Sequence, residues 1–282
     1  MPQRKRNPLY FASVIALIIV GAAAWYTMQD RKQDNKAVAE TSPEQTAQLE
    51  QVRPVLPTDH VRGNPNAPLV FIVYSDFECP YCKEFHTTMK HLIELYGKGG
   101  TVAWVFRHMP LVQLHPESPT YAMTSECVAE KAGEEAFWNF ADALFSAVTL
   151  DKTVGADKLL ELGEQVGVDR QWLAACVRDN RYLSTLETDF NEAKGVGANG
   201  TPFTVVISPH QRFVVAGVRP LKAMVGAVLS VNSSLHDTGL VPPASTDTTN
   251  LFQNVTSTTA VGSPVASTSA VVGTRASSNP TQ

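Results

Sequence analysis

Short apolar runs separated by polar segments mark the strands expected in this chain. Residues 69–74 form a continuous run of aliphatic, β-branched and aromatic side chains, which is typical of a strand buried on both faces of a sheet. Residues 101–106 form a second run of this kind, and residues 203–207 and 212–216 form two more. Only a tight-turn sequence separates the last two runs, so they are expected to form a hairpin.

A helix is expected between the first two runs, over residues 79–96. Pro80 suits the first helical position, because its φ is already helical and its missing N–H would have no partner there. The glycine-rich residues 97–100 then end the helix. A strand, a helix and a strand of these lengths form one βαβ unit, in which the two strands run parallel.

The central part of the chain has helical rather than strand periodicity. Apolar residues in the segment 116–194 recur at helical spacing and are interrupted by glycines, which indicates several short helices. We expect an inserted helical domain over about residues 115–196, and a last helix over 221–229. Without the insertion, the order is β-α-β and then β-β-α. The expected fold class is therefore α/β, a thioredoxin fold with an inserted helical domain.

The N-terminal segment is expected to be a transmembrane helix that precedes this domain. Residues 9–28 carry no charge, and about 20 helical residues span the roughly 30 Å hydrocarbon core of a bilayer. Three basic residues precede them, which places the N-terminus in the cytoplasm and the domain on the periplasmic or extracytoplasmic side. The alternative is a cleaved signal peptide, with residues 22–24 as its cleavage site. The length of the apolar stretch favours an uncleaved signal anchor over residues 1–28.

The remaining boundaries follow from composition. Residues 29–57 are polar and are expected to be a flexible linker. The folded domain is expected over residues 58–231, and the Ser/Thr-rich tail, residues 232–282, is expected to be disordered because it is poor in large apolar side chains. A glycosylated stalk is the alternative for this tail, because Asn232 and Asn254 stand in N-glycan acceptor patterns. With 23 basic and 27 acidic residues, the chain lacks the excess of positive charge that is typical of nucleic-acid-binding proteins.

The candidate chemistry lies in two cysteines at the start of the first helix. Cys79 occupies the expected cap, where unpaired N–H groups and the positive end of the helix dipole favour a thiolate. Cys82 follows one turn later on the same face, so the two sulfurs are able to form a disulfide. Cys79 would attack a partner's disulfide and Cys82 would resolve the mixed disulfide.

Two other interpretations compete for these cysteines. A zinc site needs two more ligands, usually a second close pair, whereas Cys127 and Cys176 are single and far apart. An inert structural disulfide is the other alternative. Redox chemistry without a metal or cofactor is favoured. Cys127 and Cys176 are either two buried free thiols or a structural disulfide closing a loop of about 50 residues; export favours the disulfide.

Several motifs together resemble the DsbA-like branch of thioredoxin-fold disulfide oxidoreductases, over roughly residues 64–229. The motifs are Ser-Asp-Phe-Glu-Cys-Pro-Tyr-Cys at 75–82, Phe-Arg-His-Met-Pro-Leu at 106–111 with His-Pro at 115–116, Cys-Val-Ala-Glu at 127–130, Phe-Trp at 137–138, Ala-Asp-Ala-Leu-Phe at 141–145 and Gly-Thr-Pro-Phe at 200–203. The resemblance implies thiol:disulfide exchange with exported cysteine-containing proteins and a quinone-linked membrane redox partner. It also implies a cis bond between Thr201 and Pro202, packed beside the cysteine pair; an ordinary trans proline is the alternative.

The chain departs from the strong oxidases of that family at two positions. Tyr81 stands where they have His, and Thr201 where they have Val, which favours a milder potential. Glu78, Pro80 and Tyr81 are expected to modulate the site, and the backbone of Thr201 to pair with an extended substrate. His86 is expected on the helix surface.

Three functions remain open at this point. A monomeric oxidase is favoured, because related isomerases have an N-terminal dimerisation domain that residues 29–57 are too short to form. An isomerase or reductase of the same fold is the second interpretation. The third, from a different class, is a membrane-tethered peptide-binding module without redox turnover.

Overall fold

The computed structural model describes residue 25 and residues 43–149, 153–221, 223–226 and 228–229. The expected signal anchor other than residue 25, the linker up to residue 42 and the tail at 232–282 lie outside these residues. Within the described part of the chain, no helix has both the length and the apolar character needed to cross a membrane.

The core of the molecule is a five-stranded mixed sheet with the strand order β1-β3-β2-β4-β5. Its members are β1 (His60–Gly63), β2 (Leu69–Ser75), β3 (Val102–His108), β4 (Phe203–Ile207) and β5 (Arg212–Ala216). The expected parallel pairing of β2 with β3 is confirmed, as is the antiparallel hairpin of β4 with β5. The edge strand β1, which pairs antiparallel with β3, was not predicted.

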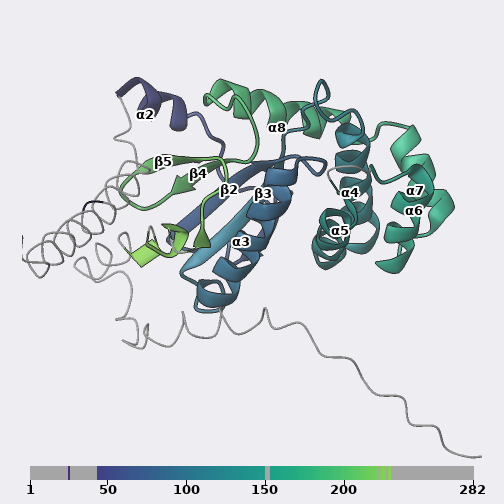
Figure 1. The fold of residues 1–282 in the computed structure, drawn as a ribbon, viewed down its shortest axis with the longest axis horizontal. Coiled ribbons are helices and arrows are strands. Elements are labelled where there is room, and N and C mark those ends of the chain that lie inside the picture. The colour runs from purple at the N-terminus through teal and green to yellow at the C-terminus, as the bar shows by residue number, and fades with distance from the viewer. Residues whose placement is uncertain (1–24, 26–42, 150–152, 222, 227, 230–282) are drawn as a thin grey trace, which may run out of the picture. The chain divides into compact units, whose positions relative to one another are not determined.

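Helices cover both faces of this sheet. The helix α3 (Pro80–Tyr96) packs on one face through Phe85, Met89 and Leu92, while α8 (Leu183–Gly195) lies toward the other (Figure 1). The alternation of side chains along β2 explains this, since Val70, Ile72 and Tyr74 all join the core beneath α8. Both faces are buried, in agreement with the uninterrupted apolar run that predicted this strand.

The expectation that residues 29–57 form a flexible linker is partly wrong, because the second half of this segment belongs to the folded domain. It contains the helix α2 (Pro43–Leu49), and Leu49 and Val52 are fully buried in the core beneath α8. Arg53 forms ion pairs with Asp189 and Glu192 of α8. The polar composition was misleading here, because a few buried apolar residues and an ion-pair network hold the segment in place.

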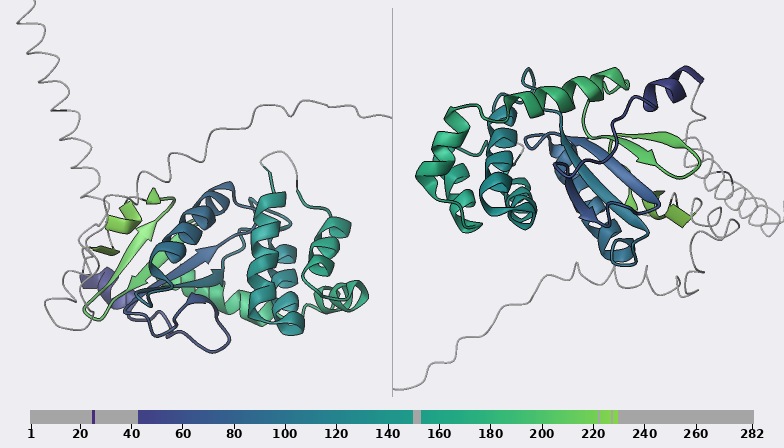
Figure 2. Two further views of the ribbon diagram at one scale, coloured as in Figure 1. Left: turned by 90° about the horizontal axis from the view of Figure 1, so that it is seen from below. Right: turned by 180° about the vertical axis from the view of Figure 1, so that it is seen from behind.

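The helical insertion, expected over about residues 115–196, is present. Its members are α4 (Ser118–Ala132), α5 (Glu134–Ala147), α6 (Ala156–Gln165), α7 (Arg170–Arg178) and α8. Figure 2 shows the first four of these stacked beside the sheet. A disulfide between Cys127 and Cys176, with an S–S distance of 2.03 Å, joins α4 to α7. The last expected helix is present at 221, 223–226 and 228–229.

Candidate active site

The two candidate cysteines lie at the N-terminus of α3, directly after β2. Cys79 is the N-cap residue, with extended backbone angles φ −74° and ψ 122°, and Pro80 opens the helix. The two sulfurs are not bonded to each other and both are buried, with exposed fractions of 4% for Cys79 and 1% for Cys82. A reacting partner therefore reaches Cys79 first.

The start of β4 brings a second segment to these sulfurs. Register pairs Tyr74 near the end of β2 with Phe203, so the residues before Phe203 lie beside the start of α3. The peptide bond between Thr201 and Pro202 is cis, and the Cys79 Sγ lies 3.6 Å from the Thr201 carbonyl oxygen. Proline has no N–H to offer, so this carbonyl is the backbone group of the loop that contacts the sulfur.

The two sulfurs differ strongly in acidity. The pKa of Cys79 is lowered to about 6, chiefly because the Cys82 thiol donates a hydrogen bond to it, against the opposing effect of burial. The Thr201 side chain and the backbone N–H groups of Cys82 and Tyr81 lower it further. Burial raises the pKa of Cys82 well above its usual value, and the neighbouring Cys79 raises it further. Cys79 is thus the thiolate and Cys82 the thiol at neutral pH.

Asp76, for which the sequence indicated no separate role, organises the loop beside the cysteines. Its backbone N–H donates to the Cys82 Sγ at 3.4 Å. Its buried carboxylate accepts hydrogen bonds from the Leu111 N–H at 2.8 Å, from the Ser118 hydroxyl at 2.6 Å and from the His115 Nδ1 at 2.8 Å. The loop after β3 is therefore anchored against the active-site turn. Asp76 and His115 both stand in the motifs that carried the family resemblance, which is the signal that marked them.

The three expected modulators have different positions. Pro80 is at the helix start, and Tyr81 is 64% exposed next to the buried sulfurs. The Glu78 carboxylate accepts a hydrogen bond from the Glu117 N–H at 3.0 Å, and partial burial raises the pKa of Glu78. Glu78 therefore holds the segment after β3 in place, as Asp76 does.

The expectation of a surface position for His86 is wrong. This side chain is buried between α3 and α5, where its Nε2 lies 2.6 Å from the Asp142 Oδ1 and its ring contacts Trp104 and Phe145. Burial lowers the pKa of His86, although Asp142 opposes this effect. His86 therefore helps to dock the insertion on α3.

Comparison with known proteins places this geometry among thioredoxin-like proteins. The family model described as Thioredoxin (Thioredoxin_4) matches residues 56–214, more than half of the chain. Among solved structures, alpha-DsbA1 of Wolbachia pipientis has a TM-score of 0.58 at 22% identity, covering 68% of this chain and 98% of that one. BdbD of Bacillus subtilis, in its oxidised form, has a TM-score of 0.55 at 19% identity, covering 64% and 96%. At these identities the likeness is one of fold.

Curated relatives extend well beyond the length of this chain. The Na(+)/H(+) antiporter NhaA 3 of Salinispora tropica is 32% identical over 176 residues, which are 62% of this chain and 25% of the relative. The Na(+)/H(+) antiporter NhaA 1 of Mycolicibacterium gilvum is 29% identical over 174 residues, 61% of this chain and 27% of the relative. The chain thus spans about a quarter of the length of these relatives, and their transport activity is not carried over to it.

Proposed function

Because this chain belongs to the thioredoxin family and has the fold of DsbA proteins, we propose that it is a thiol:disulfide oxidoreductase that forms disulfides in exported proteins. The observation that carries the proposal is the position of Cys79. Its sulfur lies at a helix N-terminus, contacts the Thr201 carbonyl of the cis-proline loop and has a pKa of about 6 beside a protonated Cys82.

The oxidative reaction starts from the disulfide between Cys79 and Cys82. A substrate thiolate attacks the Cys79 Sγ, the bond between the two cysteines breaks, and Cys82 leaves and takes up a proton. A second substrate thiolate then attacks the substrate sulfur of the mixed disulfide, and Cys79 leaves as a thiolate. The substrate loses two electrons and two protons; the cysteine pair receives both electrons, Cys82 one proton and solvent the other.

The difference in acidity favours this direction. A thiol of low pKa is a good leaving group, so the mixed disulfide at Cys79 resolves readily toward the substrate disulfide. Stabilisation of the Cys79 thiolate also stabilises the reduced pair, which makes the disulfide more oxidising. Return to the disulfide needs a two-electron acceptor, which we propose is the quinone-linked membrane partner that the family resemblance implies.

Substrate and location are part of the same proposal. The backbone of Thr201 beside Cys79 provides an edge with which an extended cysteine-containing segment pairs. Oxidative chemistry of this kind operates where disulfides persist, outside the cytoplasm. The protein is proposed to be a monomer, and the uncharged stretch at residues 9–28 supports its anchoring in the membrane by one helix, with its domain on the extracytoplasmic side.

The reduction potential of the Cys79–Cys82 pair tests the direction. We expect equilibration with glutathione to give a value more oxidising than the ~−270 mV of thioredoxin. A value at or below that of thioredoxin would instead assign the chain to the reductases.

Variants of the two cysteines test whether the protein turns over at all. Cys79→Ser should abolish oxidation of a reduced substrate peptide. Cys82→Ser should accumulate a mixed disulfide when it is given the disulfide-linked dimer of a single-cysteine peptide, because the Cys79 thiolate displaces one peptide thiolate and no Cys82 is present to release the other peptide. Mass spectrometry detects this mixed disulfide. A chain that still binds the peptide but shows neither turnover nor a trapped disulfide would be a peptide-binding module.

A further inference from the structure

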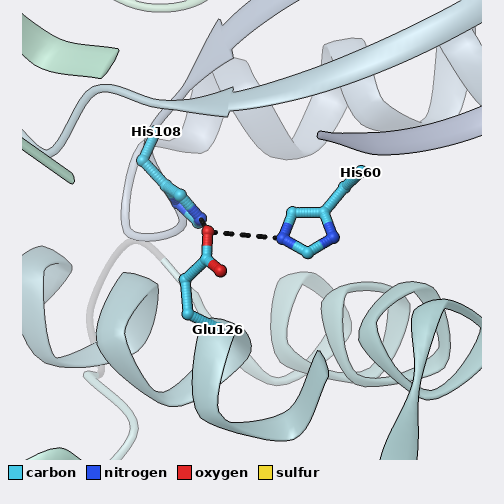
Figure 3. Close-up of side chains that lie close together, drawn as sticks. All are labelled: His60, His108 and Glu126. Atoms are coloured by element: carbon cyan, nitrogen blue, oxygen red, sulfur yellow. Dashed lines mark hydrogen bonds and ion pairs between the residues drawn. The ribbon is translucent and has the colours of Figure 1, made fainter. Parts of the chain in front are cut away.

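A buried cluster of two imidazoles and one carboxylate lies where the sheet meets the inserted helices. His60 comes from β1, His108 from the end of β3 and Glu126 from α4. Figure 3 shows a carboxylate oxygen of Glu126 between the two rings. The exposed fractions are 5%, 1% and 7%, and none of the three takes part in the cysteine chemistry proposed above.

The spacing of the donor atoms is that of a metal site. The Glu126 Oε1 lies 3.1 Å from the His108 Nε2 and 3.3 Å from the His60 Nε2. All three donor atoms lie within 4.8 Å of one another. Donors bound at about 2.0–2.1 Å around a tetrahedral Zn²⁺ are separated by about 3.3 Å. An ion therefore fits among these atoms with only a small movement of the imidazoles.

The surroundings of His60 orient its ring as a ligand. Its Nδ1 lies 2.9 Å from the Glu134 Oε2 of α5, the carboxylate–histidine contact that accompanies metal-binding imidazoles and sets their tautomer. Phe137 stacks on the ring with a centroid separation of 3.4 Å and an interplanar angle of 7°. The opposite nitrogen, Nε2, is buried and points toward the Glu126 Oε1 at 3.3 Å. This contact is an ion pair only while the ring is protonated, and a metal ion bound to both atoms would take the place of that proton.

We propose that His60, His108 and Glu126 bind one divalent transition-metal ion, Zn²⁺ by the nature of the donors. Two imidazole nitrogens and one carboxylate oxygen are a zinc ligand set, and the fourth position is left for a water molecule or the second Glu126 oxygen. Glu126 supplies one negative charge inside the site, and Glu134, whose side chain is 45% exposed, supplies a second beside it, so the ion would not be an unpaired buried charge.

The proposed role of the ion is structural. Its ligands come from two strands and one inserted helix, and Glu134 adds a second helix through His60. A bound ion would cross-link the sheet to the insertion, and binding to the folded state alone raises stability. Glu126 also precedes Cys127, so the disulfide to α7 and the metal would hold the same turn of α4.

The test uses the full-length chain in detergent, with Cys79→Ser and Cys82→Ser in every sample so that the thiol pair binds no metal. After treatment with a chelator, Zn²⁺ is titrated calorimetrically and the thermal unfolding midpoint is measured with and without the ion. We expect one Zn²⁺ per chain and a higher midpoint. His60→Gln and Glu126→Gln should each weaken binding by at least ~100-fold, and Glu134→Gln by ~10–100-fold, because it removes only the outer partner.

The matched control is His91→Gln, which changes an exposed histidine of α3 and should bind Zn²⁺ as the parent does. Near-ultraviolet circular dichroism shows whether each variant is folded. Co²⁺ bound to the parent gives a second readout that needs no ligand variant, since a nitrogen and oxygen site has a ligand-field spectrum without thiolate charge transfer. The proposal is overturned if the folded parent binds no stoichiometric Zn²⁺, or if His60→Gln and Glu126→Gln bind it as tightly as His91→Gln.

Discussion

Two cysteines three positions apart have pKa values shifted in opposite directions, that of Cys79 downward chiefly by a hydrogen bond and that of Cys82 upward chiefly by burial. The Cys79 sulfur receives the hydrogen bond of the Cys82 thiol and lies near helix N–H groups, whereas Cys82 is more deeply buried. The helix dipole alone contributes about 0.3–1 kcal/mol when exposed and up to ~2 when partly buried. The thiol-to-thiolate hydrogen bond is therefore the largest cause of the lowered pKa of Cys79, and burial is the largest cause of the raised pKa of Cys82.

Alkylation kinetics should reveal this difference directly. We expect the reaction rate of the reduced protein with iodoacetamide to rise with pH around a midpoint of about 6, the pKa of Cys79. Cys82→Ala should move the midpoint upward, because it removes the largest cause of the lowered pKa, while Cys82→Ser keeps a donor and should move it less. A wild-type midpoint near 9, the ordinary value for a thiol, would contradict the assignment of Cys79 as the thiolate.

The same ionisation should make the stability of the reduced protein depend on pH. The pKa of Cys79 falls from 9 to about 6 on folding, so its contribution is fully present above the unfolded value and is lost as pH falls through the folded value. The oxidised protein has no such group. We expect urea unfolding to show the reduced form gaining stability relative to the oxidised form between about pH 6 and about pH 9. A difference that stays constant with pH would argue against the lowered pKa.

At the scale of elements, the strand β3 carries an arginine into the core. Arg107 is fully buried, and its guanidinium forms ion pairs with Asp59 at 2.8 Å and with Glu192 of α8 at 2.9 Å. Glu192 also accepts a hydrogen bond from the Tyr74 hydroxyl at 2.7 Å. Arg53, in the segment expected to be a linker, pairs with the same Glu192, so the network ties β2, β3 and α8 to that segment.

Removal of this buried cation should be strongly destabilising. Arg107→Met removes the positive charge that pairs with two buried carboxylates. We expect this change to lower the free energy of unfolding by about 3–5 kcal/mol. Urea denaturation of the oxidised protein measures the change. The control is Arg178→Met, which removes an exposed arginine and should change stability by no more than ~0.5 kcal/mol. Equal stability of the two variants would show that the network contributes little.

The disulfide between α4 and α7 should stabilise the insertion without serving the redox reaction. Its cysteines are separated by 49 residues, and a closed loop of that length is worth about 4 kcal/mol in the chain-entropy model. We expect the double variant Cys127→Ala with Cys176→Ala to lose stability of this order in urea denaturation and to retain peptide oxidation where it stays folded. Loss of turnover in the folded variant would show instead that this disulfide takes part in the reaction.

The sequence predicted the elements whose burial is continuous and missed those held by a few distant contacts. The apolar runs of β2, β3, β4 and β5 specify strands by themselves, and Pro80 marks the start of α3. In contrast, β1 and α2 are short and polar, and their positions depend on partners far along the chain, such as Glu134 for β1. His86 was misplaced for the same reason, since its spacing in α3 does not reveal that α5 covers it.

The residues of the candidate site also fall into those that local sequence predicts and those that distant contacts bring together. Cys79 and Cys82 follow from local spacing, and the closeness of Thr201 to Cys79 was expected from the family resemblance. The carboxylate of Asp76 takes three of its partners from residues 35 to 42 positions away, and the cluster of His60, His108 and Glu126 comes from three elements. Such clusters depend on how the insertion packs against the sheet. Hydrophobic periodicity predicts single helices and strands, and it does not predict this packing.

For the whole molecule, the proposed activity requires the domain to be outside the cytoplasm, and residues 1–28 are expected to place it there. We expect the full chain to remain in the membrane fraction after a high-salt wash, to be released by detergent and to keep residues 1–28. A membrane-impermeant maleimide added to intact cells under reducing conditions should label Cys79, because its thiolate is present at neutral pH.

The controls separate anchoring from orientation. Replacement of residues 1–28 by a cleavable signal peptide should give a soluble extracytoplasmic domain whose Cys79 is still labelled, and Cys79→Ser should abolish labelling of both forms. Replacement of Arg4, Lys5 and Arg6 by uncharged residues should weaken the preference for this orientation, because the basic flank retains the N-terminus in the cytoplasm. A soluble product cleaved near residues 22–24 would show that the segment is a signal peptide, and labelling only after cell lysis would place the domain, and with it the oxidative chemistry, on the wrong side of the membrane.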